Sequence, residues 1–99
     1  MGRKDKTKYS SPEFKLALIA LQNLIREGDL DRGISECKRL IKKEPLEPMP
    51  QNIFGVVLAN LGNLGEAEIA FKKAVSLDST YDEAWCNLGE LLVAVNKPS

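Results

Sequence analysis

The sequence contains no histidine, the side chain that most often serves proteins as a general base or metal ligand. Its two cysteines, Cys37 and Cys86, lie far apart and offer neither a disulfide framework nor a zinc cluster. No glycine-rich phosphate loop and no nucleophile motif occurs. We therefore predict that the chain is not an enzyme and that it has no catalytic residues, no cofactor and no metal site.

An excess of charge of one sign and long apolar runs are also missing. Fourteen basic residues balance fourteen acidic ones, so nothing draws the chain generally toward nucleic acid or acidic membranes. No segment reaches the about 18 apolar residues that a membrane span requires, and the charged residues 1–8 do not resemble a signal peptide. With unpaired thiols, this predicts a cytoplasmic protein with neither nucleic acid nor membrane as a partner.

The chain of 99 residues has the composition of one small globular domain, with 43% hydrophobic residues. Residues 1–11 hold four basic residues and one acid, a net charge of +3. They are expected to form a basic flexible tail, either merely solvated or touching RNA, lipid or an acidic partner. Residues 12–95 are expected to form the folded domain, and residues 96–99 a short second tail.

From Ser11 onward the pattern is helical. Ser11-Pro12-Glu13 is a typical helix start, and apolar residues then recur at helical spacing. The predicted apolar stripe of this first helix is Leu16, Ala17, Ala20, Leu21 and Leu24. Gly28-Asp29 predicts a helix stop followed by a new helix cap, and Thr80-x-x-Glu83 predicts a later capping box.

The same pattern returns after 34 residues. Gly28 corresponds to Gly62, Leu30 to Leu64, and Gly55 to Gly89. A repeat of this length is typical of stacked supersecondary units. The sequence therefore predicts an all-α solenoid of antiparallel helix pairs, with five helices in about two and a half units at residues 14–47, 48–81 and 82–95.

Two motifs carry a resemblance to a known family. Trp85-x2-Leu88-Gly89-x2-Leu92 and Ala67-x3-Phe71, with Ala74 behind them, are similar to the signature of the tetratricopeptide repeat. The resemblance covers residues 14–95 and implies a right-handed solenoid. The first unit departs from the pattern, with Ala17, Leu21 and Leu40 where the later units hold Trp85, glycine and Ala74, and we interpret it as a degenerate capping unit.

Small residues at matched intervals indicate close helix packing. Gly55 and Gly89 are expected where a Cβ would hold the antiparallel helix away, with the small Ala67 opposite. Large aromatic residues are expected to fill the space between units. The predicted repeat-packing residues are Gly55, Ala67, Phe71, Ala74, Trp85, Leu88 and Gly89.

The last predicted helix raises a question about its uncovered side. Trp85, Leu88, Leu92 and Val95 are expected to cover the preceding hairpin, leaving an apolar edge beyond them. Three alternatives are open: the natural chain continues past Ser99, a second copy covers the edge in a homo-oligomer, or a short end is tolerated.

The family's geometry implies that the first helix of each pair lines a concave groove. The residues this places in the groove are Lys15, Leu18, Gln22, Ile25, Met49, Asn52, Val56, Ala59, Glu83, Cys86 and Glu90. This set is apolar in the middle, cationic near Lys15 and anionic near Glu83 and Glu90, which suits a peptide ligand. Cys86 is also a candidate reactive thiol, whereas Cys37 lies on an apolar stripe and is predicted in the core.

One version of the family binds acidic chaperone tails through a carboxylate clamp of Lys, Asn and Arg. The matching positions here are Leu18, Gln22, Ile53, Glu83 and Asn87. Glu83 would repel a carboxylate where a lysine is required, so no chaperone tail of this kind is expected as a partner.

Three functions from different classes follow. The first is an adaptor or scaffold that binds a protein segment in its groove. The second is the N-terminal repeat portion of a larger enzyme, of the glycosyltransferase or sulfotransferase type. The third is a structural module that assembles with copies of itself.

Overall fold

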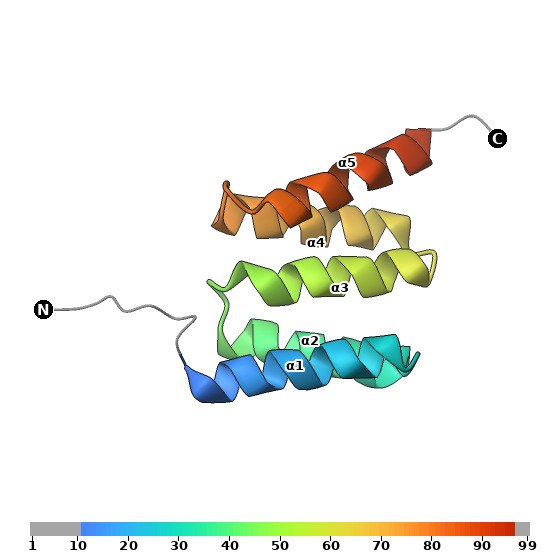
Figure 1. The fold of residues 1–99 in the computed structure, drawn as a ribbon. Helices are drawn as coiled ribbons and strands as arrows, with labels where there is room; N and C mark the ends of the chain where they lie inside the picture. The colour runs from blue at the N-terminus through green and yellow to red at the C-terminus, as the bar shows by residue number, and fades with distance from the viewer. Residues whose placement is uncertain (1–10, 97–99) are drawn as a thin grey trace, which may run out of the picture.

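The structure is a computed structural model in which residues 11–96 are described. Five helices follow one another: α1 (Pro12–Arg26), α2 (Leu30–Lys43), α3 (Pro48–Asn60), α4 (Leu64–Leu77) and α5 (Asp82–Asn96). Helices α1, α3 and α5 form one layer, and α2 and α4 lie behind it (Figure 1). The predicted all-α solenoid with two and a half helix pairs is confirmed. Of the predicted tails at 1–11 and 96–99, residues 1–10 and 97–99 lie outside the described residues, whereas Ser11 is the N-cap of α1 and Asn96 ends α5.

The ends of the helices follow from local chemistry. Ser11 Oγ accepts a hydrogen bond from the Phe14 N–H at 3.3 Å, and Asp29 Oδ1 accepts one from the Arg32 N–H at 3.3 Å. Gly28 and Gly62 end α1 and α3 with φ of +85° and +84°, a left-handed conformation that a side chain would disfavour. The capping box predicted at Thr80 is wrong: the Thr80 hydroxyl donates to Asp78 Oδ1, and α5 begins two residues later.

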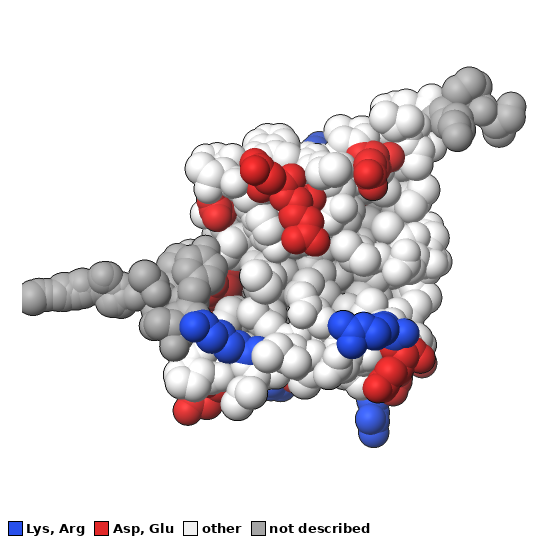
Figure 2. All heavy atoms as spheres, viewed as in Figure 1, with Lys and Arg blue, Asp and Glu red and all other residues white. Residues whose placement is uncertain are grey.

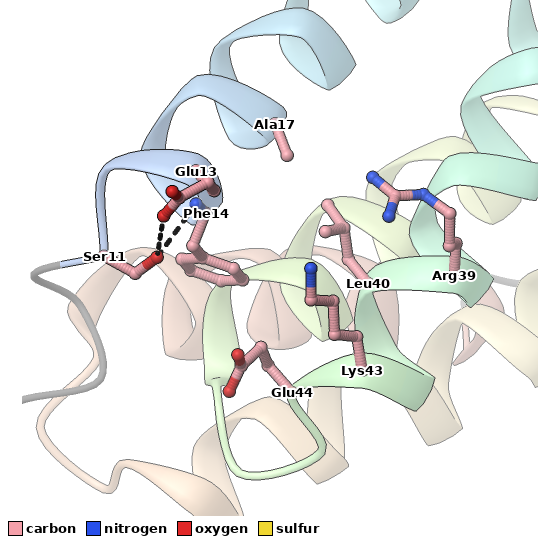
Figure 3. Close-up of a pocket in the computed structure, with 8 residues that line it drawn as sticks. All are labelled: Ser11, Glu13, Phe14, Ala17, Arg39, Leu40, Lys43 and Glu44. Atoms are coloured by element: carbon pink, nitrogen blue, oxygen red, sulfur yellow. Dashed lines mark hydrogen bonds between the residues drawn. The ribbon is translucent and has the colours of Figure 1, made fainter.

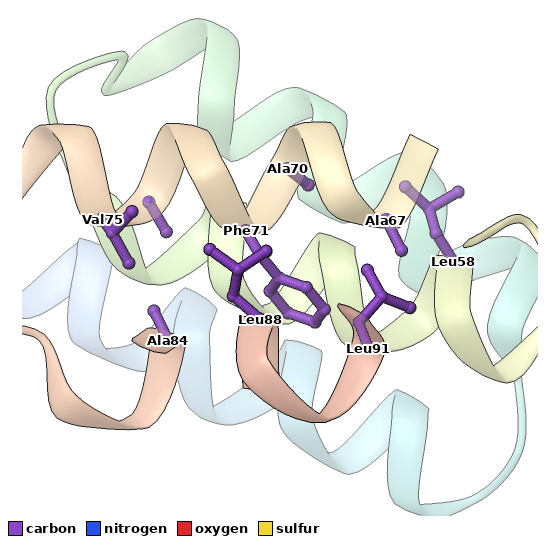
Figure 4. Close-up of a cluster of buried hydrophobic side chains, with 9 residues drawn as sticks. Leu58, Ala67, Ala70, Phe71, Val75, Ala84, Leu88 and Leu91 are labelled. Atoms are coloured by element: carbon purple, nitrogen blue, oxygen red, sulfur yellow. The ribbon is translucent and has the colours of Figure 1, made fainter. Parts of the chain in front are cut away.

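Two apolar clusters fill the stack, and α3 contributes to both. One cluster joins α1 and α2 to α3, and consists of Phe14, Leu18, Leu21, Cys37, Leu40 and Ile53. The other joins α3 and α4 to α5 (Figure 4), and consists of Leu58, Ala67, Ala70, Phe71, Ala74, Val75, Ala84, Leu88 and Leu91. Since each hairpin buries its neighbour, no unit of the described chain holds its own core alone.

The most extensive helix contact, between α3 and α4, depends on Gly55. A methyl group added at Gly55 would lie 2.5 Å from Cε1 and 2.6 Å from Cδ1 of the buried Phe71 ring. The expectation that a side chain here would force the helices apart is therefore supported. The residue opposite Gly55 is Phe71 rather than the predicted Ala67, because the phenyl ring itself occupies the space that glycine leaves open.

At the equivalent positions of the first hairpin, the large and the small residue are exchanged between the two helices. Thirty-four residues before Gly55 and Phe71 stand Leu21 and Cys37, both fully buried in one cluster. A large residue on the first helix faces a small one on the second, so the total volume is roughly conserved. Burial also raises the pKa of the Cys37 thiol to about 12.

Two packing expectations fail on the outer side of α5. A methyl group added at Gly89 would meet nothing within 4 Å, and Trp85 is 48% exposed with its indole N–H donating to the Ser79 carbonyl at 2.8 Å. No helix of residues 11–96 covers that side. Ala84, Leu88 and Leu91 are the residues that α5 buries, whereas the predicted Val95 is exposed.

The apolar stripe predicted for the first helix is also displaced. Leu16 is 66% exposed, and α1 instead buries Phe14, Leu18 and Leu21. Both stripes have helical spacing, so periodicity alone could not choose between them. Helices α2 and α3 together determine which stripe is buried, because Cys37, Leu40 and Ile53 belong to the cluster that these three residues form.

Gly55 and Gly89 provide a matched pair of substitutions. Both lie inside helices with ordinary backbone angles, so alanine improves helix propensity at each by up to about 1 kcal/mol. We expect Gly89→Ala to raise the unfolding free energy by this amount. Gly55→Ala is expected to lower it by about 1–3 kcal/mol, because the Phe71 ring must move. Urea denaturation followed by circular dichroism measures both, and equal effects of one sign would contradict the packing described.

Candidate functional site

The candidate site is the surface formed by α1, α3 and α5, called here the first-helix face. Its charge changes from one end to the other (Figure 2): acidic atoms lie over α5, basic and acidic atoms over α1, and the middle of the band over α3 is uncharged. The sequence explains this, because α3 has no charged side chain and the charged residues of α5 are Asp82, Glu83 and Glu90. The face therefore offers an apolar middle between a mixed end and an acidic end.

The predicted groove residues divide by burial. Lys15, Gln22, Glu83, Cys86 and Glu90 are exposed on their helices, and Val56 is half-buried, as are Ile25, Met49 and Ala59. Leu18 and Asn52 are 8% and 2% exposed, and they belong to the packed interior beneath the face. A 34-residue step links Leu18, Asn52 and Cys86, so one position of the repeat is buried in two units and exposed in the third.

Asn52 is buried within a polar network that joins three segments. Its Nδ2 donates to the Tyr81 hydroxyl at 3.3 Å, and its Oδ1 accepts from Asn87 Nδ2 at 3.0 Å. A buried amide requires such partners, and leaving one unpaired costs about 1–3 kcal/mol. The network therefore fixes α5 against α3 and sets the spacing of the two helices on the first-helix face.

A hollow of about 330 Å³ opens between α3 and α5. Leu64 and Phe71 of α4 contribute to its lining, and the rest comes from the two helices of the first-helix face. These further lining residues are Val56, Ala59, Asn60, Asn87, Glu90, Leu91 and Ala94. The hollow is thus mainly apolar, with two amides and one carboxylate as its polar groups.

Sequence reasoning placed Val56, Ala59 and Glu90 on this face but missed Asn60 and Ala94. The 34-residue spacing contains the signal that could have found them, because Arg26, Asn60 and Ala94 occupy one position of the repeat. Asn87 is one of the clamp positions named from the sequence. Its second role, holding Asn52, depends on the distance between α3 and α5 and is not visible in a sequence pattern.

A second hollow, of about 460 Å³, lies between α1 and α2 (Figure 3). Its charged lining residues are Glu13, Arg39, Lys43 and Glu44, and its apolar ones are Phe14, Ala17 and Leu40. Arg39 is already engaged by Glu36, with its Nη2 at 2.6 Å from Oε2. None of the sequence-predicted groove residues lines this hollow, and it lies away from the hollow between α3 and α5.

Residues 11–96 show no gathering of three or more Cys, Asp or Glu side chains that could hold a metal ion. None of the five described helices is long and apolar enough to cross a membrane. The thiols differ sharply, because Cys37 is fully buried and Cys86 is exposed, with its Sγ 3.8 Å from Glu90 Oε2.

Antiparallel helix pairs in a 34-residue register, each burying the next, define an α-solenoid of repeated hairpins. The family model of the tetratricopeptide repeat matches residues 51–81, which cover most of α3, all of α4 and the turn after it. With the relatives and solved structures below, this identifies the chain as a tetratricopeptide-repeat protein.

Curated relatives extend the likeness over most of the chain. Human "Superkiller complex protein 3" is 31% identical over 87 residues, and "Tetratricopeptide repeat protein 37" of Xenopus laevis is 28% identical over 88 residues. These alignments include 88% and 89% of this chain. The chain spans only 6% of the length of each relative.

Solved structures share the fold. The "TPR2B-domain:pHsp70-complex of yeast Sti1" superposes with a TM-score of 0.79 at 20% identity, over 86% of this chain and 68% of that one. "MamA 41-end from Desulfovibrio magneticus RS-1" superposes with a TM-score of 0.76 at 26% identity, over 86% of this chain and 48% of the other.

The contrast between the thiols gives a direct test of the packing. We expect Ellman's reagent to modify one thiol in the native protein and two in denaturant, because Cys37 reacts only after its hairpin opens. Cys86→Ser is the control and should leave the native protein unreactive. Modification of Cys37 at the rate of an exposed thiol would contradict the burial described.

Proposed function

We propose that this chain is a non-enzymatic binding module that holds a segment of a partner protein against the first-helix face. The observation that carries the proposal is the hollow between α3 and α5, which opens on this face among three of the predicted groove residues. A mainly apolar concavity with a few polar groups is the usual form of a binding site.

The composition of the face supports this function. Val56 and Ala59 remain half-buried rather than covered, and no charged side chain of α3 interrupts the middle of the face. Apolar side chains of an extended or helical segment can bury their surface there, gaining about 25 cal/mol per Å². The name of the human and mouse relatives places those proteins in a complex, which agrees with a scaffold role for this chain.

The charges on the face argue against an acidic chain terminus as the ligand. Among the positions that would form a carboxylate clamp, Leu18 and Ile53 are buried in the core and Glu83 is an exposed acid. Asn87 donates to Asn52 and is committed to the network between α3 and α5. A carboxylate placed there would meet repulsion and few donors, so we propose a different class of segment.

Selection from a displayed library of random peptides, followed by NMR of the complex, tests this function. We expect enriched peptides to shift the amide resonances of α1, α3 and α5 on the first-helix face, because that is where the uncovered apolar surface and the hollow lie. Peptides that shift only α2 and α4 would overturn the proposed location, and failure to enrich any peptide would overturn the function itself.

The matched variants for this experiment are charge reversals. Glu83→Lys with Glu90→Lys should change peptide affinity with only a small loss of melting temperature, because both side chains are exposed and only Glu83 interacts with the N-terminal end of α5. Glu66→Lys changes an exposed acid on α4 and should leave the affinity unchanged. Identical binding by the Glu83/Glu90 variant and the parent would show that α5 is not part of the binding site.

A further inference from the structure

We propose that the hollow between α3 and α5 receives a lysine or arginine side chain of the bound segment. Its apolar stem would lie between Val56 and Leu91, and its cationic end would reach the carboxylate of Glu90. This inference rests on the proposed function and specifies the chemistry of the ligand. Its basis is the combination of an apolar hollow with one uncompensated acid in its lining.

The shape of the hollow suits a long unbranched side chain. Val56 and Ala59 of α3 lie across from Leu91 and Ala94 of α5, with Phe71 of α4 completing the apolar lining. The long side chains of lysine and arginine bury their methylene groups against apolar surface while the charged end stays near water. A short polar side chain would leave most of this lining uncovered.

The polar groups that line the hollow favour a positively charged side chain on the ligand. Glu90, Asn60 and Asn87 line the hollow, and the Glu90 carboxylate is the one charged group in its lining. An ammonium or guanidinium group can donate to the carboxylate and to amide oxygens, whereas an acidic side chain would be repelled.

Glu90 forms no salt bridge within residues 11–96, in contrast to Glu36 and Glu68. Glu36 pairs with Arg39 at 2.6 Å, and Glu68 pairs with Lys72 at 2.8 Å, each within its own helix. No lysine or arginine of residues 11–96 lies within salt-bridge distance of Glu90, and its carboxylate accepts a hydrogen bond from the weak donor Cys86 Sγ at 3.8 Å. α5 itself contains no basic residue, so its acidic charge remains available to a ligand.

Of the three repeat units, only the last has an acidic residue at the position of Glu90. The positions equivalent to Glu90 in the first two units are Gln22 and Val56. The preference for a basic side chain is therefore expected at one place along the bound segment, next to α5, and not in every unit. This makes the position of a basic residue in selected peptides a specific readout.

The experiment begins with the peptides selected by the parent protein. We expect one position to be enriched in lysine and arginine together, and we expect this enrichment to vanish when the selection is repeated with Glu90→Gln. Glu83→Gln is the matched control, because Glu83 is exposed on the same helix face but does not line the hollow. Peptides selected with Glu83→Gln should still be enriched in lysine and arginine at that position.

A binding measurement on one selected peptide then isolates the contribution of the basic residue's charge to the affinity. Replacing its basic residue with norleucine keeps an apolar stem, and we expect affinity for the parent to fall roughly 2- to 5-fold, as for exposed ion pairs. With Glu90→Gln the same replacement should change the affinity less than twofold. Peptides that bind the first-helix face without a basic position, or an equal loss with both proteins, would overturn this inference while leaving the proposed function standing.

Discussion

The close approach of α3 and α4 at Gly55 is the constraint on which the rest of the structure depends. The Phe71 ring fills the space that a side chain at Gly55 would occupy, so the two helices pack along their length. Phe71 also reaches the second cluster, where Leu88 and Leu91 of α5 lie against it, and it lines the hollow on the first-helix face. One glycine–aromatic pair thus connects the hairpin, the stacking of the next unit and the floor of the candidate site.

Comparison of the units shows how a repeat tolerates different residues at one position. The first hairpin buries Leu21 in one cluster with the small side chain of Cys37, whereas the second places Gly55 against Phe71. What the fold requires is the summed volume across the hairpin rather than a glycine at a fixed place. The two hairpins still differ, because α1 and α2 make a less extensive contact than α3 and α4 and leave a hollow between them.

The fold was largely predictable because its signals are local and periodic. Proline, Ser11, Asp29 and two left-handed glycines mark helix ends, and a 34-residue register repeats them. Errors arose where neighbouring helices decide, as when α2 and α3 together determine which apolar stripe of α1 is buried. Gly89 and Trp85 carry the family pattern, yet they face a side that no described helix covers, so the pattern could not reveal their exposure.

The candidate site was predictable in outline only. The geometry implied by the family resemblance placed Val56 and Glu90 on one face. It could not show that Asn52 is buried or that Asn87 holds it, because both depend on the distance between helices. The charge of Glu90 gains significance from the same geometry. An acid without a basic partner beside an apolar hollow differs physically from the paired acids of α2 and α4.

A double-mutant cycle that gives the second hairpin the residues of the first tests the central claim most directly. Gly55→Leu and Phe71→Cys should each destabilise the protein, one by overfilling the contact and the other by emptying it. Together they recreate the Leu21–Cys37 arrangement, so the account predicts that the double variant is more stable than the sum of the single effects by at least about 1 kcal/mol. Strictly additive unfolding free energies would contradict it.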